Sequence, residues 1–159
     1  MNAVDINRND ELRDLYRELI LDHAKNPRHF GKLANPTHSA AGINPLCGDK
    51  LHLYVHVDAE DRIDNASFEG AGCAISVASA SLMTDTVIGM TVAEALDYFA
   101  AITRRMTKSM PAESAGIDLG KLVALDGVRE YPSRIKCATL AWHALNSALH
   151  ERGATVTTE

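Results

Sequence analysis

The 159-residue sequence lacks the features that mark membrane, secreted and nucleic-acid-binding proteins. It has no apolar stretch near the roughly 20 residues that a membrane-spanning helix requires. The N-terminus has no basic region followed by an apolar run, so it does not resemble a secretory signal. The formal net charge of −5 argues against nucleic acid or an anionic membrane as the main partner. We therefore expect a cytoplasmic protein that binds neither nucleic acid nor membrane.

Cysteine is also scarce, because the chain has only Cys47, Cys73 and Cys137. An odd number of widely spaced cysteines does not indicate a disulfide framework. Reduced cysteines are small buried residues, nucleophiles or metal ligands. Burial is the most common of these for a single cysteine, so the local sequences decide between the three.

The sequence also has no internal repeats, no low-complexity segments and no linker long enough to divide it. Its length and its apolar share of 46% are typical of one globular domain. We predict a single α+β domain over residues 1–159, in which a small antiparallel three-stranded sheet packs against several helices. Residues 1–9 and 152–159 are expected to be flexible tails.

Helical patterns begin at four places, which are Asn9, Cys73, Thr91 and Ser133. Asn9 is a capping residue followed by two acidic residues, and Pro27 should end that first helix. Thr91 with a glutamate three residues later forms a capping box. Residues 108–127 have no regular pattern and are predicted to form short helices and loops.

The strand patterns lie between the first two helices. Residues 51–57 alternate apolar and polar side chains, residues 62–69 form a less regular second strand, and a third is expected within residues 39–43. His52 and His56 share the polar face of the strand at residues 51–57, about 13 Å apart. We expect them to face solvent rather than to bind one ion together.

The first cysteine lies in a loop beside a carboxylate. Gly48 lets this loop adopt backbone angles that other residues avoid, so that Cys47 and Asp49 can turn toward the same point. The segment is Asn44-Pro45-Leu46-Cys47-Gly48-Asp49.

The other two cysteines are placed near helix starts. Cys73 follows Gly70-Ala71-Gly72 and opens the second helix, and Cys137 falls in the first turn of the last helix if Ser133 is its cap. The positive end of a helix lowers the pKa of a thiol and stabilises the thiolate. A cysteine that only fills the core gains nothing from such a place.

Three thiolates and one carboxylate form a complete tetrahedral ligand set for zinc. The candidate ligands are Cys47, Asp49, Cys73 and Cys137. A divalent ion neutralises only two of their four negative charges. Arg134 and Lys136 flank Cys137 and either offset part of the remainder or simply lie in solvent at a helix start.

These segments resemble the IscU/SufU-type iron–sulfur cluster assembly proteins, over about residues 12–149. The resemblance rests on four segments, which are His23-Ala24-Lys25-Asn26-Pro27-Arg28, Asn44-Pro45-Leu46-Cys47-Gly48-Asp49, Gly70-Ala71-Gly72-Cys73-Ala74-Ile75-Ser76 and Arg134-Ile135-Lys136-Cys137-Ala138-Thr139-Leu140-Ala141-Trp142.

Within this family the chain is most similar to the SufU branch. The scaffold branch typically has a Leu-Pro-Pro-Val-Lys segment and a histidine directly before the third cysteine. Here the third cysteine is preceded by Lys136, the segment reads Tyr131-Pro132-Ser133-Arg134-Ile135-Lys136, and the stretch between the second and third cysteines is longer.

The resemblance implies a sulfurtransferase-like activity that depends on zinc held by Cys47, Asp49, Cys73 and Cys137. Cys47 would be the catalytic residue, freed from zinc when a side chain of the partner replaces it. It would take persulfide sulfur from a pyridoxal-phosphate cysteine desulfurase of the SufS type and pass it to a downstream iron–sulfur assembly scaffold. Gly48, Gly72, Arg134 and Lys136 would support the site.

Two alternatives remain open at this point. The same ligands suit a scaffold that holds a labile [2Fe–2S] cluster or iron, because one oxygen ligand weakens the attachment. A binding module with purely structural zinc also fits a closed four-ligand site. Structural sites usually consist of paired cysteines close in sequence, which disfavours the second alternative.

Overall fold

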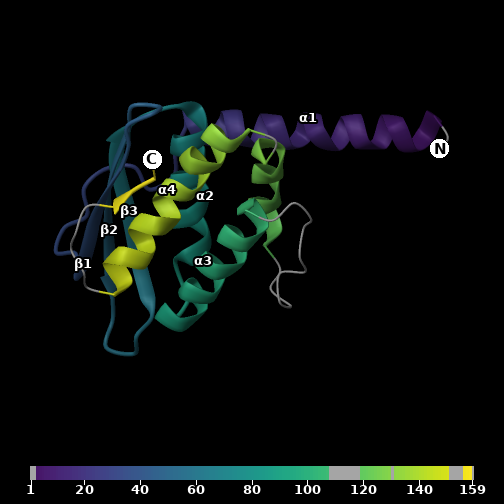
Figure 1. Cartoon of the computed structure of the whole chain (residues 1–159). Helices are drawn as coiled ribbons and strands as arrows, with labels where there is room; N and C mark the ends of the chain where they lie inside the picture. Colours follow the sequence, from purple (N-terminus) through teal and green to yellow (C-terminus); the bar gives the residue numbers. More distant parts are fainter. Residues whose placement is uncertain (1–2, 108–118, 130, 151–155, 159) are drawn as a thin grey trace.

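A computed structural model describes residues 3–107, 119–129, 131–150 and 156–158, with only the backbone for residues 3–13. Its elements in chain order are α1 (Ala3–Lys25), β1 (His38–Asn44), β2 (Asp49–Val57), β3 (Ile63–Ala71), α2 (Ala74–Val87), α3 (Val92–Thr107), the 3₁₀ helix η1 (Gly120–Val128), α4 (Pro132–Leu149) and β4 (Val156–Thr157). Helices gather on one side of a single sheet, and α1 extends away from the rest of the molecule (Figure 1). The predicted α+β class is confirmed.

The sheet has four strands rather than the predicted three, in the order β3-β2-β1-β4. β1, β2 and β3 form the expected antiparallel meander. The added strand β4 pairs in parallel with β1, and the N–H of Thr158 donates to the carbonyl oxygen of Ile43 at 3.1 Å. These residues lie in the predicted C-terminal tail. Two residues are too few to show alternation, so only their contact with β1 defines the strand.

Two helix starts differ from the prediction. α1 begins at Ala3, so the expected start at Asn9 lies within the helix. α4 begins at Pro132 with Tyr131 as its N-cap, and Ser133 is therefore not the cap. Proline suits the first helical position because its backbone angle is already helical and its missing N–H has no partner to lose there.

The other predicted helices are confirmed. The capping box of α3 is present, since the N–H of Glu94 donates to Thr91 Oγ1 at 3.1 Å and the N–H of Thr91 donates to Glu94 Oε1 at 3.2 Å. Of the stretch predicted to be irregular, residues 120–128 form η1, and residues 108–118 lie outside the described part of the chain. No described helix is long and apolar enough to cross a membrane.

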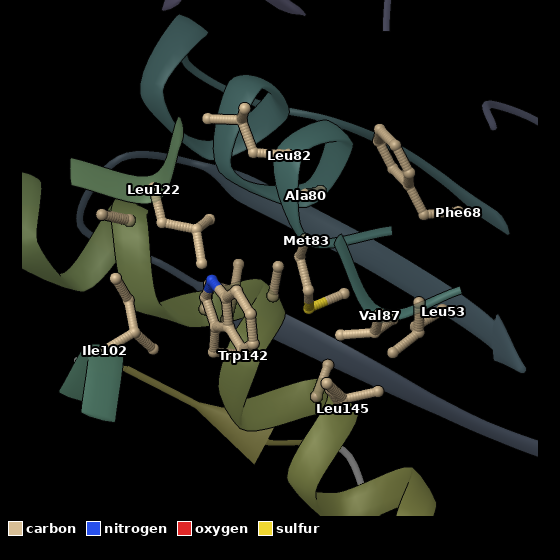
Figure 2. Close-up of a cluster of buried hydrophobic side chains, with 14 of the residues drawn as sticks. Leu53, Phe68, Ala80, Leu82, Met83, Val87, Ile102, Leu122, Trp142 and Leu145 are labelled. Atoms are coloured by element: carbon tan, nitrogen blue, oxygen red, sulfur yellow. The ribbon is translucent and has the colours of Figure 1, made fainter. Parts of the chain in front are cut away.

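The core lies between the sheet and the helices, with α4 at its centre. Trp142 of α4 is fully buried and lies among apolar side chains from the other helices (Figure 2). Its neighbours in the buried cluster include Met83, Ile102, Leu122 and Leu145. Since eleven residues of α4 are buried, this helix is held firmly, and so is any ligand that it carries.

Candidate metal centre

The β1–β2 hairpin forms one wall of the candidate site. Asn44 and Asp49 are the last cross-strand pair before a four-residue loop, residues 45–48. The N–H of Cys47 donates to the carbonyl oxygen of Asn44 at 3.3 Å, which closes a β-turn with Pro45 in its favoured second position. Gly48 follows with a φ of 70°, in the left-handed region that glycine adopts without strain. The hairpin thus leaves Cys47 exposed and directs Asp49 into the protein.

Asp49 is fully buried and is held by a neighbouring backbone group. Its Oδ1 accepts the N–H of Cys73 at 2.8 Å. A Cβ atom on Gly72 would lie 2.5 Å from this Oδ1, so the close approach depends on the absence of a side chain there. The sequence prediction that Gly72 supports the site has this physical reason.

Cys73 is the N-cap of α2, as the sequence predicted. Its Sγ accepts the N–H of Ser76 at 3.5 Å and lies 3.9 Å from Asp49 Oδ2. The side chain is half-buried. Cys73 therefore connects the carboxylate to the positive end of a helix.

Cys137 occupies a different position from the one predicted. Because α4 begins at Pro132, Cys137 lies in its second turn, and it is fully buried. Burial raises the pKa of the Cys137 thiol, and the hydrogen bond to Cys47 adds to the effect. The pKa is thus raised rather than lowered as the sequence predicted, and a bound divalent cation would favour the thiolate.

The candidate ligands converge although they are distant in sequence. One ligand atom each from Cys47, Asp49 and Cys137 lies within 4.8 Å of the other two, and the two sulfur atoms are 3.2 Å apart. Cys73 joins this group through its 3.9 Å contact with the carboxylate. The structure thus brings together all four residues that the sequence suggested as ligands.

The buried carboxylate of Asp49 favours a cation in this place. None of the ion pairs between described residues includes it. Buried charges in proteins are paired or coordinate a metal. Three sulfur atoms and one oxygen suit tetrahedral zinc, and the same donors can hold the iron of a cluster.

The two basic residues that flank Cys137 lie nearer the surface than Cys137 itself. Arg134 is exposed and Lys136 is half-buried, in the first two turns of α4. That they offset the charge of the site stays a prediction.

The group of ligand atoms found among the described residues includes no histidine. His52 is exposed and stacks on Tyr54 with ring centroids 4.5 Å apart, and His56 contacts Asp64 at 2.6 Å. Both lie on the polar side of β2, as predicted. His23 is buried, with its Nδ1 2.7 Å from Ser81 Oγ, where it joins α1 to α2.

Asn44 was not among the site residues predicted from the sequence, and it is also fully buried. Its Nδ2 donates to Asp49 Oδ2 at 3.2 Å and to Cys137 Sγ at 3.4 Å. The signal was available in principle, because a four-residue hairpin loop after residue 44 places its side chain beside that of residue 49.

Comparison with known proteins agrees with this geometry. The profile of the NifU-like N-terminal domain matches residues 15–138. The zinc-dependent sulfurtransferase SufU of Bacillus subtilis (strain 168) is 43% identical over 141 residues, which cover 89% of this chain and 93% of SufU. The iron–sulfur cluster assembly scaffold protein IscU of Streptococcus pyogenes serotype M1 is 42% identical over 142 residues, which cover 87% of this chain and 85% of IscU.

The fold agrees as well. A crystal structure from Fervidobacterium islandicum AW-1, described as an iron–sulfur cluster assembly scaffold protein for the SUF system, superposes with a TM-score of 0.76 at 37% identity, covering 83% of this chain and 94% of that one. The N-terminal part of a NifU-like protein from Brucella abortus gives a TM-score of 0.74 at 26% identity, covering 88% and 95%. The chain therefore belongs to the family of NifU-like N-terminal domains, and its relatives there are SufU- and IscU-type proteins of iron–sulfur cluster assembly.

Proposed function

We propose that this protein accepts persulfide sulfur on Cys47 from a pyridoxal-phosphate cysteine desulfurase and passes it to iron–sulfur cluster assembly. The observation that carries the proposal is the unequal burial of the ligand group. Cys47 is exposed, whereas Asp49 and Cys137 are fully buried and Cys73 is half-buried. Cys47 is therefore the most accessible of the three cysteines to a sulfur atom carried by another protein.

Zinc fits the donor set and would be held by Cys47, Asp49, Cys73 and Cys137. When bound, it keeps thiols deprotonated and shields them from oxidation. The fit rests on the buried carboxylate without an ion-pair partner among the described residues and on the three sulfur atoms around it. The name of the Bacillus subtilis relative supports this choice of metal.

The transfer itself is a thiol–disulfide exchange. The Cys47 thiolate attacks the outer sulfur of the desulfurase persulfide, a new S–S bond forms, and the old one breaks. The desulfurase cysteine leaves as a thiolate, and Cys47 then carries the persulfide. Asp49, Cys73 and Cys137 keep their places because the sheet and two helices hold them.

Relatives named IscU favour a second candidate, a scaffold on which a [2Fe–2S] cluster is assembled. The same four residues would then bind iron. The name of the Bacillus subtilis protein, at slightly higher identity, favours sulfur transfer.

The test combines metal analysis with a sulfur-transfer assay. The purified protein is assayed for zinc and iron, then mixed with a SufS-type desulfurase, pyridoxal phosphate and cysteine. Peptide mass spectrometry locates any added sulfur atom, with Cys47→Ser and Asp49→Ala beside the wild type. We expect one zinc, a persulfide on Cys47 and faster desulfurase turnover, with both effects of sulfur transfer lost in Cys47→Ser.

Other results identify the alternatives. A brown protein that contains iron and no persulfide supports the scaffold. One bound zinc without persulfide or faster turnover, together with a loss of stability in Cys47→Ser, supports a purely structural metal and overturns the proposal.

A further inference from the structure

Asn44 is a buried polar residue placed between two of the candidate ligands. It ends β1, is fully buried, and its Nδ2 reaches both Asp49 Oδ2 and Cys137 Sγ. Its Oδ1 is buried without a hydrogen-bond partner among the described residues. An unpaired buried carbonyl costs free energy, which an apolar residue here would avoid. The amide is thus retained against a cost in stability.

The hydrogen bonds make the three thiols unequal. Cys73 Sγ accepts the backbone N–H of Ser76, and Cys137 Sγ accepts the side-chain N–H of Asn44. For Cys47 Sγ, the hydrogen bonds of the described residues include only the contact with Cys137 Sγ. An N–H donor draws electron density from sulfur and lowers its reactivity toward electrophiles, as donors around metal-bound thiolates do.

We propose that Asn44 is a positioning residue that determines which thiol reacts. Its amide holds Cys137 and Asp49 together as fixed ligands and lowers the nucleophilicity of Cys137. Cys47 is left as the exposed sulfur without an N–H donor among the described residues. This inference deepens the proposed function and rests on it only in taking the four residues as a metal site. The selectivity among the thiols does not require that sulfur be transferred.

The main test measures zinc affinity and thiol reactivity in Asn44→Leu, which has a similar volume but no donor. Zinc affinity is measured by competition with a chromogenic chelator. Thiol reactivity is measured by brief treatment of the zinc-saturated protein with substoichiometric iodoacetamide, followed by peptide mass spectrometry. We expect zinc affinity to fall about 10- to 100-fold, as for other residues that orient ligands. The share of label on Cys137 relative to Cys47 should rise at least about threefold, because zinc holds both sulfurs as thiolates and only Cys137 loses an N–H donor.

Ser67→Ala is the matched control. Ser67 is also buried on a strand of the sheet, and its Oγ also lacks a hydrogen-bond partner among the described residues. It lies in the middle of β3, opposite Tyr54 rather than at the hairpin end. This substitution tests the loss of a buried polar group alone and should leave both zinc affinity and the label ratio unchanged.

Asn44→Ser, with a smaller side chain, is measured in parallel in case the leucine variant does not fold. The wild-type protein provides a further test that needs no variant. Equal labelling of Cys137 and Cys47 in the folded wild type would overturn the proposal. So would an unchanged label ratio in a folded Asn44 variant. Neither readout uses a desulfurase, so failure of this inference is distinguishable from failure of the proposed sulfur transfer.

Discussion

The candidate metal centre has two walls of different construction. The hairpin wall, residues 44–49, carries Cys47 in a loop whose four residues are all exposed, including Leu46 at 66%. The helical wall consists of Cys73 at the start of α2 and Cys137 within α4. Both of its helices have most of their residues buried.

Because of this difference, Cys47 can move away from a bound metal, whereas Cys73 and Cys137 cannot. Moving the loop disturbs few buried contacts, whereas moving Cys137 disturbs the core around Trp142. A group that must accept sulfur and release it again is best placed on the hairpin wall. The ligands that preserve the geometry are best placed on the helical wall and on the buried strand position of Asp49.

The largest effect on stability and zinc affinity is expected for Gly72→Ala, because Gly72 lies where the two walls meet. The added Cβ would lie 2.5 Å from Asp49 Oδ1, so the carboxylate must move and lose the N–H of Cys73. We expect about 1–3 kcal/mol lower stability from overpacking. Zinc should bind at least about tenfold more weakly, because a residue that orients a ligand is disturbed. Urea unfolding and chelator competition measure the two effects.

Gly127→Ala provides the matched control for this prediction. A Cβ atom at Gly127 would meet nothing within 4 Å. It should leave zinc affinity unchanged. If Gly72→Ala binds zinc as tightly as Gly127→Ala does, the two walls do not depend on the contact between Asp49 and Cys73.

A medium effect is expected when one cysteine from each wall is removed from the metal-free protein. Cys137→Ala deletes a fully buried sulfur and should lower the free energy of unfolding by about 1–2 kcal/mol. Cys47→Ala deletes an exposed one and should change it by no more than about 0.5 kcal/mol. Equal losses in urea unfolding of the two variants would mean that the two cysteines contribute equally to stability despite their different burial.

The smallest effect is expected for His23, whose contact with Ser81 joins α1 to α2, the helix that begins at Cys73. Burial lowers the pKa of His23 below the unfolded value of 6.5, and the positive charge of Arg28 lowers it further. Ser81 Oγ accepts the N–H of Arg28 at 2.8 Å and lies 2.7 Å from His23 Nδ1, and the lowered pKa favours the neutral ring. Since the unfolded chain binds the proton more readily, this contribution to stability is complete above about pH 6.5 and is lost as the pH falls below it.

Thermal unfolding of the metal-free protein at about pH 7.5 and about pH 5.5 tests this. We expect the unfolding temperature of the wild type to fall by a few degrees more, roughly 2–6 °C, than that of His23→Gln. The pKa of His143 is also lowered by burial, but His143 is present in both proteins and its effect cancels. Equal falls in the two proteins would show that His23 does not stabilise the helical wall through its neutral ring.

Prediction from sequence succeeded where the signal is local. The alternation in β2, the capping box of α3 and the cap of α2 at Cys73 each extend over a few residues. It failed where two local signals competed, as at the start of α4, where proline at the first helical position prevailed over a serine cap. It also failed for β4, whose two residues form a strand only because β1 leaves an edge for them to pair with.

The sequence by itself determined the kinds of element, the single domain and the chemical identity of the candidate ligands. Only the tertiary structure decided how these ligands differ from one another. Cys137 and Cys47 meet across 90 positions of sequence, and Asn44 reaches Cys137 across 93. Burial, the absence of an ion-pair partner for Asp49 among the described residues, and the donor on Cys137 arise from such long-range contacts. No local pattern encodes them, because each depends on how α4 packs against the sheet.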